Sequence, residues 1–173
     1  MDEATIEAGR RGDRRAQARL LDALQDVWFR FCLSQLRNEE QAADATQETA
    51  LRFLKQLPNF RGESQLQTWS LSISLNVIRE MRRKKKPESL ESDPELATEH
   101  SSVDLKLENA EEQTQMRQML DTLPDRQREA LTLRFFEELS VEQTAQTMNC
   151  AVGTVKATVH QALRALKQKM TKS

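Results

Sequence analysis

The spacing of apolar residues along the N-terminal half predicts three helices. Apolar positions recur every three or four residues over 18–36, over 39–57 and from 64 to the basic run that ends at 86. We expect the second helix to stop at Pro58 and the third at Pro87, because proline lacks an amide hydrogen and clashes with the preceding turn. Three helices of this length can enclose a small core.

The C-terminal part predicts a further set of helices. Helical spacing resumes near residue 108, breaks at the sequence LPD and returns over 126–139. Ser140 and Gln143 have the spacing of a capping box, and Asn149 stands where a tight turn needs a left-handed backbone. Gly153 and Thr154 are then expected to open the last helix. This order is typical of a helix-turn-helix, whose second helix enters the major groove of DNA.

The segment between the two sets of helices has a different composition. Residues 88–112 contain nine acidic and one basic side chain and show no sustained apolar period. Residues 1–87 carry a net charge of +4 and residues 113–173 one of +3, so the formal total of -1 conceals two basic ends. We therefore predict an all-α chain with two small helical domains, 1–87 and 113–173, joined by a flexible acidic linker.

Charge and composition also exclude several classes of protein. No apolar run reaches the roughly 20 residues that span a bilayer, and the acidic start is unlike a signal peptide, so we expect a cytoplasmic protein without membrane insertion. Cys32 and Cys150 lack metal-site or disulfide spacing and are interpreted as buried hydrophobic residues. With only His100 and His160, and no glycine-rich phosphate loop, the sequence predicts no enzyme, no metal and no cofactor.

Two longer motifs resemble one protein family. Residues 44–76, DATQETALRFLKQLPNFRGESQLQTWSLSISLN, resemble conserved region two of bacterial extracytoplasmic-function sigma factors, and residues 123–156 resemble region four. The resemblance implies a sigma factor that binds core RNA polymerase and directs promoter recognition, DNA melting and transcription initiation. The alternative is a free-standing helix-turn-helix transcriptional regulator, whose N-terminal helices would form a dimerisation or sensory unit.

The resemblance also implies which residues contact which partner. The partners are the clamp helices and flap of core RNA polymerase, promoter DNA and, as is common in the family, an anti-sigma factor. The residues implied in core polymerase binding are Asp44, Gln47, Glu48, Leu51 and Arg52. Those implied in minus-ten DNA binding are Arg61, Gly62, Glu63, Asn76, Arg79, Arg82 and Arg83, and those implied in minus-thirty-five DNA binding are Thr154, Lys156, Ala157, His160, Gln161 and Arg164.

Some positions of this sequence depart from the family pattern. Leu66 and Gln67 stand where many relatives have aromatic residues, and no arginine precedes Asn76. Trp69 falls in helical register with apolar neighbours, which favours a place in the core over a stacking platform for bases. The basic run after Met81 has a second interpretation as a solvated helix end that complements the helix dipole.

Overall fold

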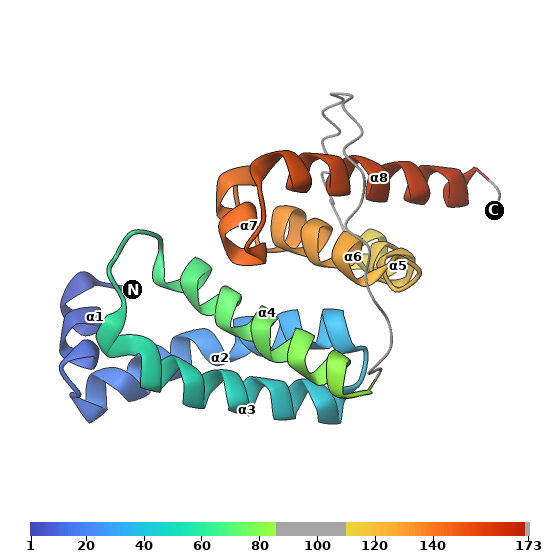
Figure 1. Cartoon of the computed structure of the whole chain (residues 1–173). Helices are drawn as coiled ribbons and strands as arrows, with labels where there is room; N and C mark the ends of the chain where they lie inside the picture. Colours follow the sequence, from blue (N-terminus) through green and yellow to red (C-terminus); the bar gives the residue numbers. More distant parts are fainter. Residues whose placement is uncertain (86–109, 172–173) are drawn as a thin grey trace. The chain divides into compact units, whose positions relative to one another are not determined.

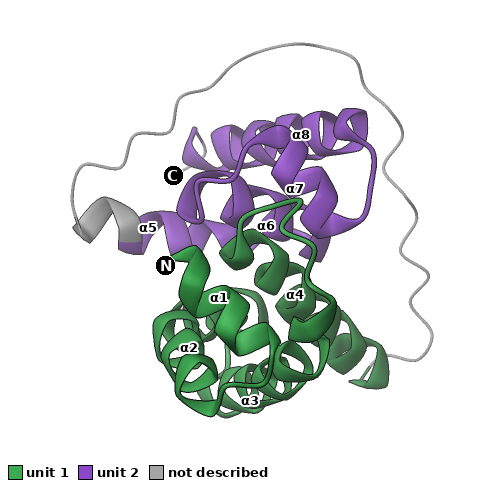
Figure 2. Ribbon diagram, turned by 90° about the vertical axis from the view of Figure 1, so that its left-hand side faces the viewer, with its two compact units in different colours: residues 1–88 green, residues 89–173 purple. Residues whose placement is uncertain are grey.

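The computed structural model describes residues 1–85 and 110–171, and every regular element in these ranges is a helix. The chain consists of two compact units, Met1–Glu88 and Ser89–Ser173 (Figure 2). The prediction of an all-helical chain is therefore confirmed. The acidic linker expected over 88–112 lies outside the described residues, except for residues 110–112, which belong to the first helix of the second unit.

Three long helices form the body of the N-terminal unit and lie side by side, each in contact with the other two (Figure 1). They are α2 (Arg14–Leu36), α3 (Glu39–Gln56) and α4 (Leu66–Lys85), with the short 3-10 helix η1 (Leu57–Asn59) after α3. Asp13 and Asn38 cap α2 and α3 by accepting hydrogen bonds from backbone amides three residues further on. Pro58 lies inside η1, so α3 ends where the sequence predicts.

The core of this unit is built around Trp28. Its side chain is fully buried, its ring lies 5.2 Å from that of Phe53, and its indole Nε1 donates a 2.9 Å hydrogen bond to Ser70 Oγ on α4. Trp69 packs between Phe53 and Phe60, at ring distances of 5.6 and 4.9 Å. Trp69 thus packs against the core, as its helical register predicts.

A short helix that the sequence analysis missed, α1 (Glu3–Arg10), packs against α2 and η1. The two helices approach closely at Gly9, where a Cβ atom would lie 2.8 Å from Leu20 Cδ1. The side chain of Gln17 donates a 3.0 Å hydrogen bond to the Gly9 carbonyl oxygen at the same point. The helix has eight residues and one apolar side chain larger than alanine, Ile6, so its periodicity is too weak to detect.

The C-terminal unit consists of shorter helices and the long last helix. They are α5 (Ala110–Leu120), α6 (Asp125–Leu131), the π-helix η2 (Thr132–Phe136), α7 (Val141–Met148) and α8 (Val152–Met170). Both α6 and α7 pack against α8. Arg128 is fully buried in α6 and donates hydrogen bonds to the Leu123 carbonyl oxygen (3.0 Å) and to Asp125 Oδ1 (2.6 Å). This arginine fixes the turn before α6.

The turn between α7 and α8 follows the sequence prediction. Ser140 and Gln143 form the capping box, with side-chain to backbone hydrogen bonds of 3.0 and 2.8 Å. Asn149 has a left-handed backbone, with φ 52° and ψ 53°. The last helix starts at Val152, one residue before Gly153. In the N-terminal unit α4 starts at Leu66, two residues after the start that the apolar spacing predicts.

Glu138 has a left-handed backbone (φ 54°) in the short loop between η2 and α7. Because a side chain at such an angle is strained and glycine is not, we expect Glu138→Gly to raise the free energy of unfolding by about 0.5–1 kcal/mol. Urea titration followed by circular dichroism measures this gain. The neighbouring Glu137 has φ -94°, so Glu137→Gly should give no such gain. Equal effects of the two substitutions would contradict the strain argument.

Candidate functional site

One solvent-facing surface of α3 collects most of the residues expected to bind core polymerase. Asp44 and Gln47 are exposed and Glu48 is half-buried. Leu51 is 65% exposed, which is unusual among the large apolar side chains that the structure describes. Arg52 is half-buried and turned toward α4. The surface therefore combines an exposed leucine with carboxylate and amide groups, a composition suited to docking a protein partner.

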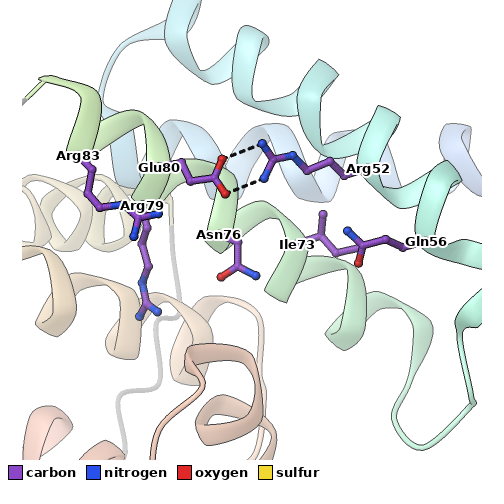
Figure 3. Close-up of a pocket in the computed structure, with 7 residues that line it drawn as sticks. All are labelled: Arg52, Gln56, Ile73, Asn76, Arg79, Glu80 and Arg83. Carbon is purple, nitrogen blue, oxygen red and sulfur yellow. Dashed lines mark hydrogen bonds and ion pairs between the residues drawn. The ribbon is translucent and has the colours of Figure 1, made fainter.

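Arg52 lies at the centre of an ion-pair network between α3 and α4 (Figure 3). Its Nη1 and Nη2 atoms donate hydrogen bonds of 2.9 and 2.7 Å to the two carboxylate oxygens of Glu80, and its Nε donates one of 2.6 Å to Glu48 Oε1. The hydrogen bonds from Arg52 are the main cause that lowers the pKa of Glu80 below its ordinary value. Hydrogen bonds to Glu80, and to a smaller extent to Glu48, raise the pKa of Arg52. Both groups of the α3–α4 pair are therefore ionised at neutral pH.

An open pocket of about 250 Å³ lies beside this network, between α3 and α4. It is lined by Arg52, Gln56, Ile73, Asn76, Arg79, Glu80 and Arg83 (Figure 3). Amide groups can pair with base edges and arginines with phosphates, so the lining suits a nucleotide of a DNA strand. Three residues expected at the minus-ten element, Asn76, Arg79 and Arg83, are brought together here. Sequence analysis did not single out Gln56, Ile73 or Glu80.

The loop residues Arg61, Gly62 and Glu63 are exposed and lie between η1 and α4, outside the lining of this pocket. Gly62 has φ 72°, a backbone angle that side chains rarely adopt, so a substitution there would be strained. The guanidinium of Arg61 lies 3.8 Å from the Glu63 carboxylate, and both side chains are mostly exposed. Such a surface pair contributes little stability, which leaves both side chains able to rearrange around a ligand.

Arg82 lies apart from the pocket lining. Its Nη2 donates to the Gln35 backbone carbonyl at 3.1 Å and to the Gln35 side-chain oxygen at 3.2 Å. These contacts attach the end of α4 to the end of α2. The residues that follow, Arg83 to Lys85, are exposed at the C-terminal end of the helix, where positive charge also complements the helix dipole.

The residues expected at the minus-thirty-five element lie on the first turns of α8 and beyond. Lys156 and Arg164 are exposed, whereas Thr154, His160 and Gln161 are half-buried. Ala157 is only 4% exposed, so its methyl group is not presented to a DNA groove, and we leave it out of the candidate surface. The remaining side chains form a mixed cationic and polar surface on the second helix of the helix-turn-helix.

Within the ranges 1–85 and 110–171, the structure holds neither a candidate metal site nor a candidate membrane span. No group of three histidine, cysteine or acidic side chains there has the arrangement of a metal site. No helix in those ranges has the length and apolar character that crossing a membrane requires. Cys32 is buried, and burial raises the pKa of its thiol to about 12, whereas Cys150 is half-buried.

Both halves of the chain match models of known protein families. Residues 19–88 match the family model for Sigma-70 region 2, and residues 113–166 match that for Sigma-70, region 4. The RNA polymerase sigma-H factor of Pseudomonas aeruginosa is 32% identical over 177 residues, which cover 95% of this chain and 91% of that protein. The ECF RNA polymerase sigma factor SigW of Bacillus subtilis is 28% identical over 98% of this chain and 97% of its own length.

Solved structures share the fold. The structure of CnrH in complex with the cytosolic domain of CnrY matches with a TM-score of 0.73 at 17% identity, covering 99% of this chain and 98% of the other. The sigma factor RpoE of Bartonella quintana, in complex with the anti-sigma factor NepR, matches with a TM-score of 0.68 at 24% identity, covering 89% and 96%.

Proposed function

We infer that this chain, which belongs to the extracytoplasmic-function group of bacterial sigma factors, recognises the two promoter elements with different units. It is a promoter-recognising sigma factor and not a free-standing regulator, since it matches sigma regions 2 and 4 in that order. We assign binding of core polymerase and the minus-ten element to a domain of residues 1–87, and binding of the minus-thirty-five element to residues 113–173. The acidic segment 88–112 lies between these two domains in the sequence, and we assign it the role of a linker up to the start of α5 at Ala110.

Membership of the family also bears on catalytic activity and on cellular location. Sigma factors as a family are not catalytic enzymes, and we propose that this chain likewise has no catalytic activity of its own. We propose the cytoplasm as its location because its partner there is core RNA polymerase.

For core polymerase we propose the α3 surface formed by Asp44, Gln47, Glu48 and Leu51. Arg52, which the family resemblance also implied, is paired with Glu80 on α4, and we leave it out of this surface. The support is the exposed leucine surrounded by polar and charged groups. An exposed apolar side chain gains most when a partner buries it, and the surrounding carboxylates can pair with basic side chains of the partner. The clamp helices of core polymerase would supply those side chains.

For the minus-ten element we propose the pocket between α3 and α4 and the loop at residues 61–63. Asn76 would contact a base edge, whereas Arg79 and Arg83 would hold the DNA backbone, and Arg82 would support the end of α4. Extruding a base from duplex DNA costs a few kcal/mol, which such contacts must compensate. Without the aromatic residues common at positions 66 and 67, stacking contributes less to this compensation.

For the minus-thirty-five element we propose the surface of α8 formed by Thr154, Lys156, His160, Gln161 and Arg164. The capping box and the left-handed Asn149 support this proposal, because they fix the crossing of α7 and α8 that lets a recognition helix enter the major groove. We expect Lys156→Ala to weaken binding of the minus-thirty-five element by about tenfold, the order of one good polar contact in a DNA groove.

The readout for Lys156→Ala is transcription from a promoter with an intact minus-thirty-five element and from one with that element scrambled. The difference between the two templates should shrink with the variant. An unchanged difference would place Lys156 outside the DNA surface. Arg30→Ala, an exposed position on α2, is the matched control.

Run-off transcription tests the proposed function as a whole. Purified core polymerase is given fragmented DNA from the source organism with and without this protein. Discrete transcripts that depend on the protein are expected, and alignment of their start sites would identify both promoter elements. Failure of the protein to associate with core polymerase would refute the proposal.

We also propose an anti-sigma partner. The support is the shared fold with RpoE of Bartonella quintana, whose structure was determined with the anti-sigma factor NepR. Pull-down of the tagged protein from its source cell should then return a second protein besides the polymerase subunits. Return of polymerase alone would count against such a partner.

A further inference from the structure

Glu80 places a negative charge inside the cationic surface proposed for the minus-ten element. On α4 it follows Asn76 by four residues and precedes Arg83 by three, so the three side chains share one side of the helix, and all three line the pocket. A carboxylate repels the DNA backbone that the neighbouring arginine is expected to bind. The function of this surface therefore depends on where the Glu80 carboxylate points.

Two sets of cations are available to Glu80. Arg83 and Lys84 lie three and four residues further along the same helix, which is the favourable order for an acidic and a basic side chain, and both influence the Glu80 carboxyl electrostatically. In the structure the carboxylate instead makes two hydrogen bonds to Arg52 on α3, at 2.9 and 2.7 Å. Figure 3 shows it turned toward Arg52.

The geometry of Arg52 explains why it holds the carboxylate. A guanidinium matches a carboxylate with two parallel hydrogen bonds, which a lysine cannot do. The third contact, from Nε to Glu48 Oε1 at 2.6 Å, fixes the plane of the guanidinium. The side chains of Arg52 and Glu80 are 31% and 36% exposed, so the pair is only partly screened by water.

We propose that Arg52 is a positioning residue for promoter DNA: it holds the Glu80 carboxylate against α3 and so keeps Arg83 and Lys84 for the DNA backbone. This inference rests on the proposed function of α4 as the minus-ten DNA helix. It gives Arg52 a role in the holoenzyme that differs from that of Leu51 and Asp44, which would contact polymerase directly.

The test compares Arg52→Gln, Glu80→Gln and the double variant Arg52→Gln/Glu80→Gln in the full-length protein. Glutamine keeps the length and polarity of both side chains but removes their charges. Affinity for core polymerase and formation of the promoter complex at saturating sigma factor are measured separately, the latter over a range of salt concentrations. Arg30→Gln on α2 is the control for loss of an exposed arginine.

We expect Arg52→Gln to leave core affinity within about twofold and to reduce promoter-complex formation about tenfold, because one phosphate contact is lost to the released carboxylate. A plot of the logarithm of the promoter-complex association constant against the logarithm of salt concentration should become shallower by about 0.9, the slope that one phosphate contact contributes. Glu80→Gln added to the same chain should restore both quantities. A purely structural role of Arg52 predicts no such rescue.

Two outcomes would overturn the inference. Weaker core binding that Glu80→Gln does not rescue would make Arg52 a polymerase contact, and an unchanged promoter complex would remove any role in DNA binding. Arg83→Gln distinguishes failure of the inference from failure of the proposed function. If Arg83→Gln leaves the promoter complex unchanged, the inference and the proposed function both fail. If Arg83→Gln weakens the complex and Arg52→Gln does not, only the inference fails. Should Arg52→Gln not fold, Arg52→Lys, which keeps the charge but not the paired geometry, is expected to show a smaller loss with the same rescue.

Discussion

Replacing Trp28 with alanine is expected to lower the free energy of unfolding of the N-terminal unit by about 3–5 kcal/mol. The indole is completely buried, packs against Phe53 with the two rings tilted by 56°, and bridges α2 to α4 through its hydrogen bond to Ser70. Removal of the ring leaves a cavity between three helices and takes away the donor that Ser70 Oγ accepts from. Denaturant titration followed by far-ultraviolet circular dichroism measures the loss.

Trp28→Phe separates the two contributions to that loss. Phenylalanine keeps most of the apolar contact with Phe53 but cannot donate to Ser70 Oγ, so we expect a loss of about 1–2 kcal/mol. Ser70 also donates to the Gln67 carbonyl oxygen at 2.8 Å, which limits the cost of the missing partner. Equal losses for the phenylalanine and alanine variants would mean that the hydrogen bond, and not the ring, carries the stability.

Replacing Leu51 with aspartate is expected to weaken binding to core polymerase by about 30-fold or more, the effect of losing one central contact of 2 kcal/mol or more. The side chain is 65% exposed in the chain alone, so the substitution removes little folding stability. In the complex it would instead place an unpaired carboxylate under the partner. Competition for core polymerase against a labelled sigma factor measures the affinity.

Ala23→Asp is the control for the Leu51 experiment. Ala23 is an exposed position on α2, and aspartate there adds the same charge outside the proposed surface. Its affinity for core polymerase should equal that of the unaltered protein. If Leu51→Asp also binds within about twofold of the unaltered protein, the α3 surface is not the docking surface.

The helices with regular apolar spacing were predictable from sequence because, in each unit, their apolar side chains face one core. Both ends of α3 and the C-terminal end of α2 were predicted within one residue for this reason, whereas α2 begins at Arg14, four residues before the predicted start. The Asn149 turn was predicted from its residue type instead. The π-helix at Thr132–Phe136 and the left-handed Glu138 were not, since both depend on how the chain packs between α6 and α7. Local sequence preferences do not carry that information.

Side-chain partners across helices were the part of the site that sequence could not supply. Spacing places Arg52 on the same helix face as Asp44 and Glu48, but it cannot show that Glu80, 28 residues later, pairs with Arg52. The same holds for Arg82, whose partner Gln35 lies on α2, 47 residues earlier in the chain. The resemblance to sigma factors predicts the surfaces, and the structure adds that Arg52 and Arg82 are engaged with partners on other helices.

The close approach of α1 and α2 at Gly9 bears on how this chain can be shortened. The match to Sigma-70 region 2 begins at residue 19, whereas Ile6 packs against the core and Gly9 lies directly over Leu20 and Leu57. A fragment trimmed to the homologous segment would open these two leucines to water and expose apolar surface that promotes aggregation. The folding boundary of the unit therefore precedes its homology boundary, and truncations intended to isolate region 2 should retain the first helix.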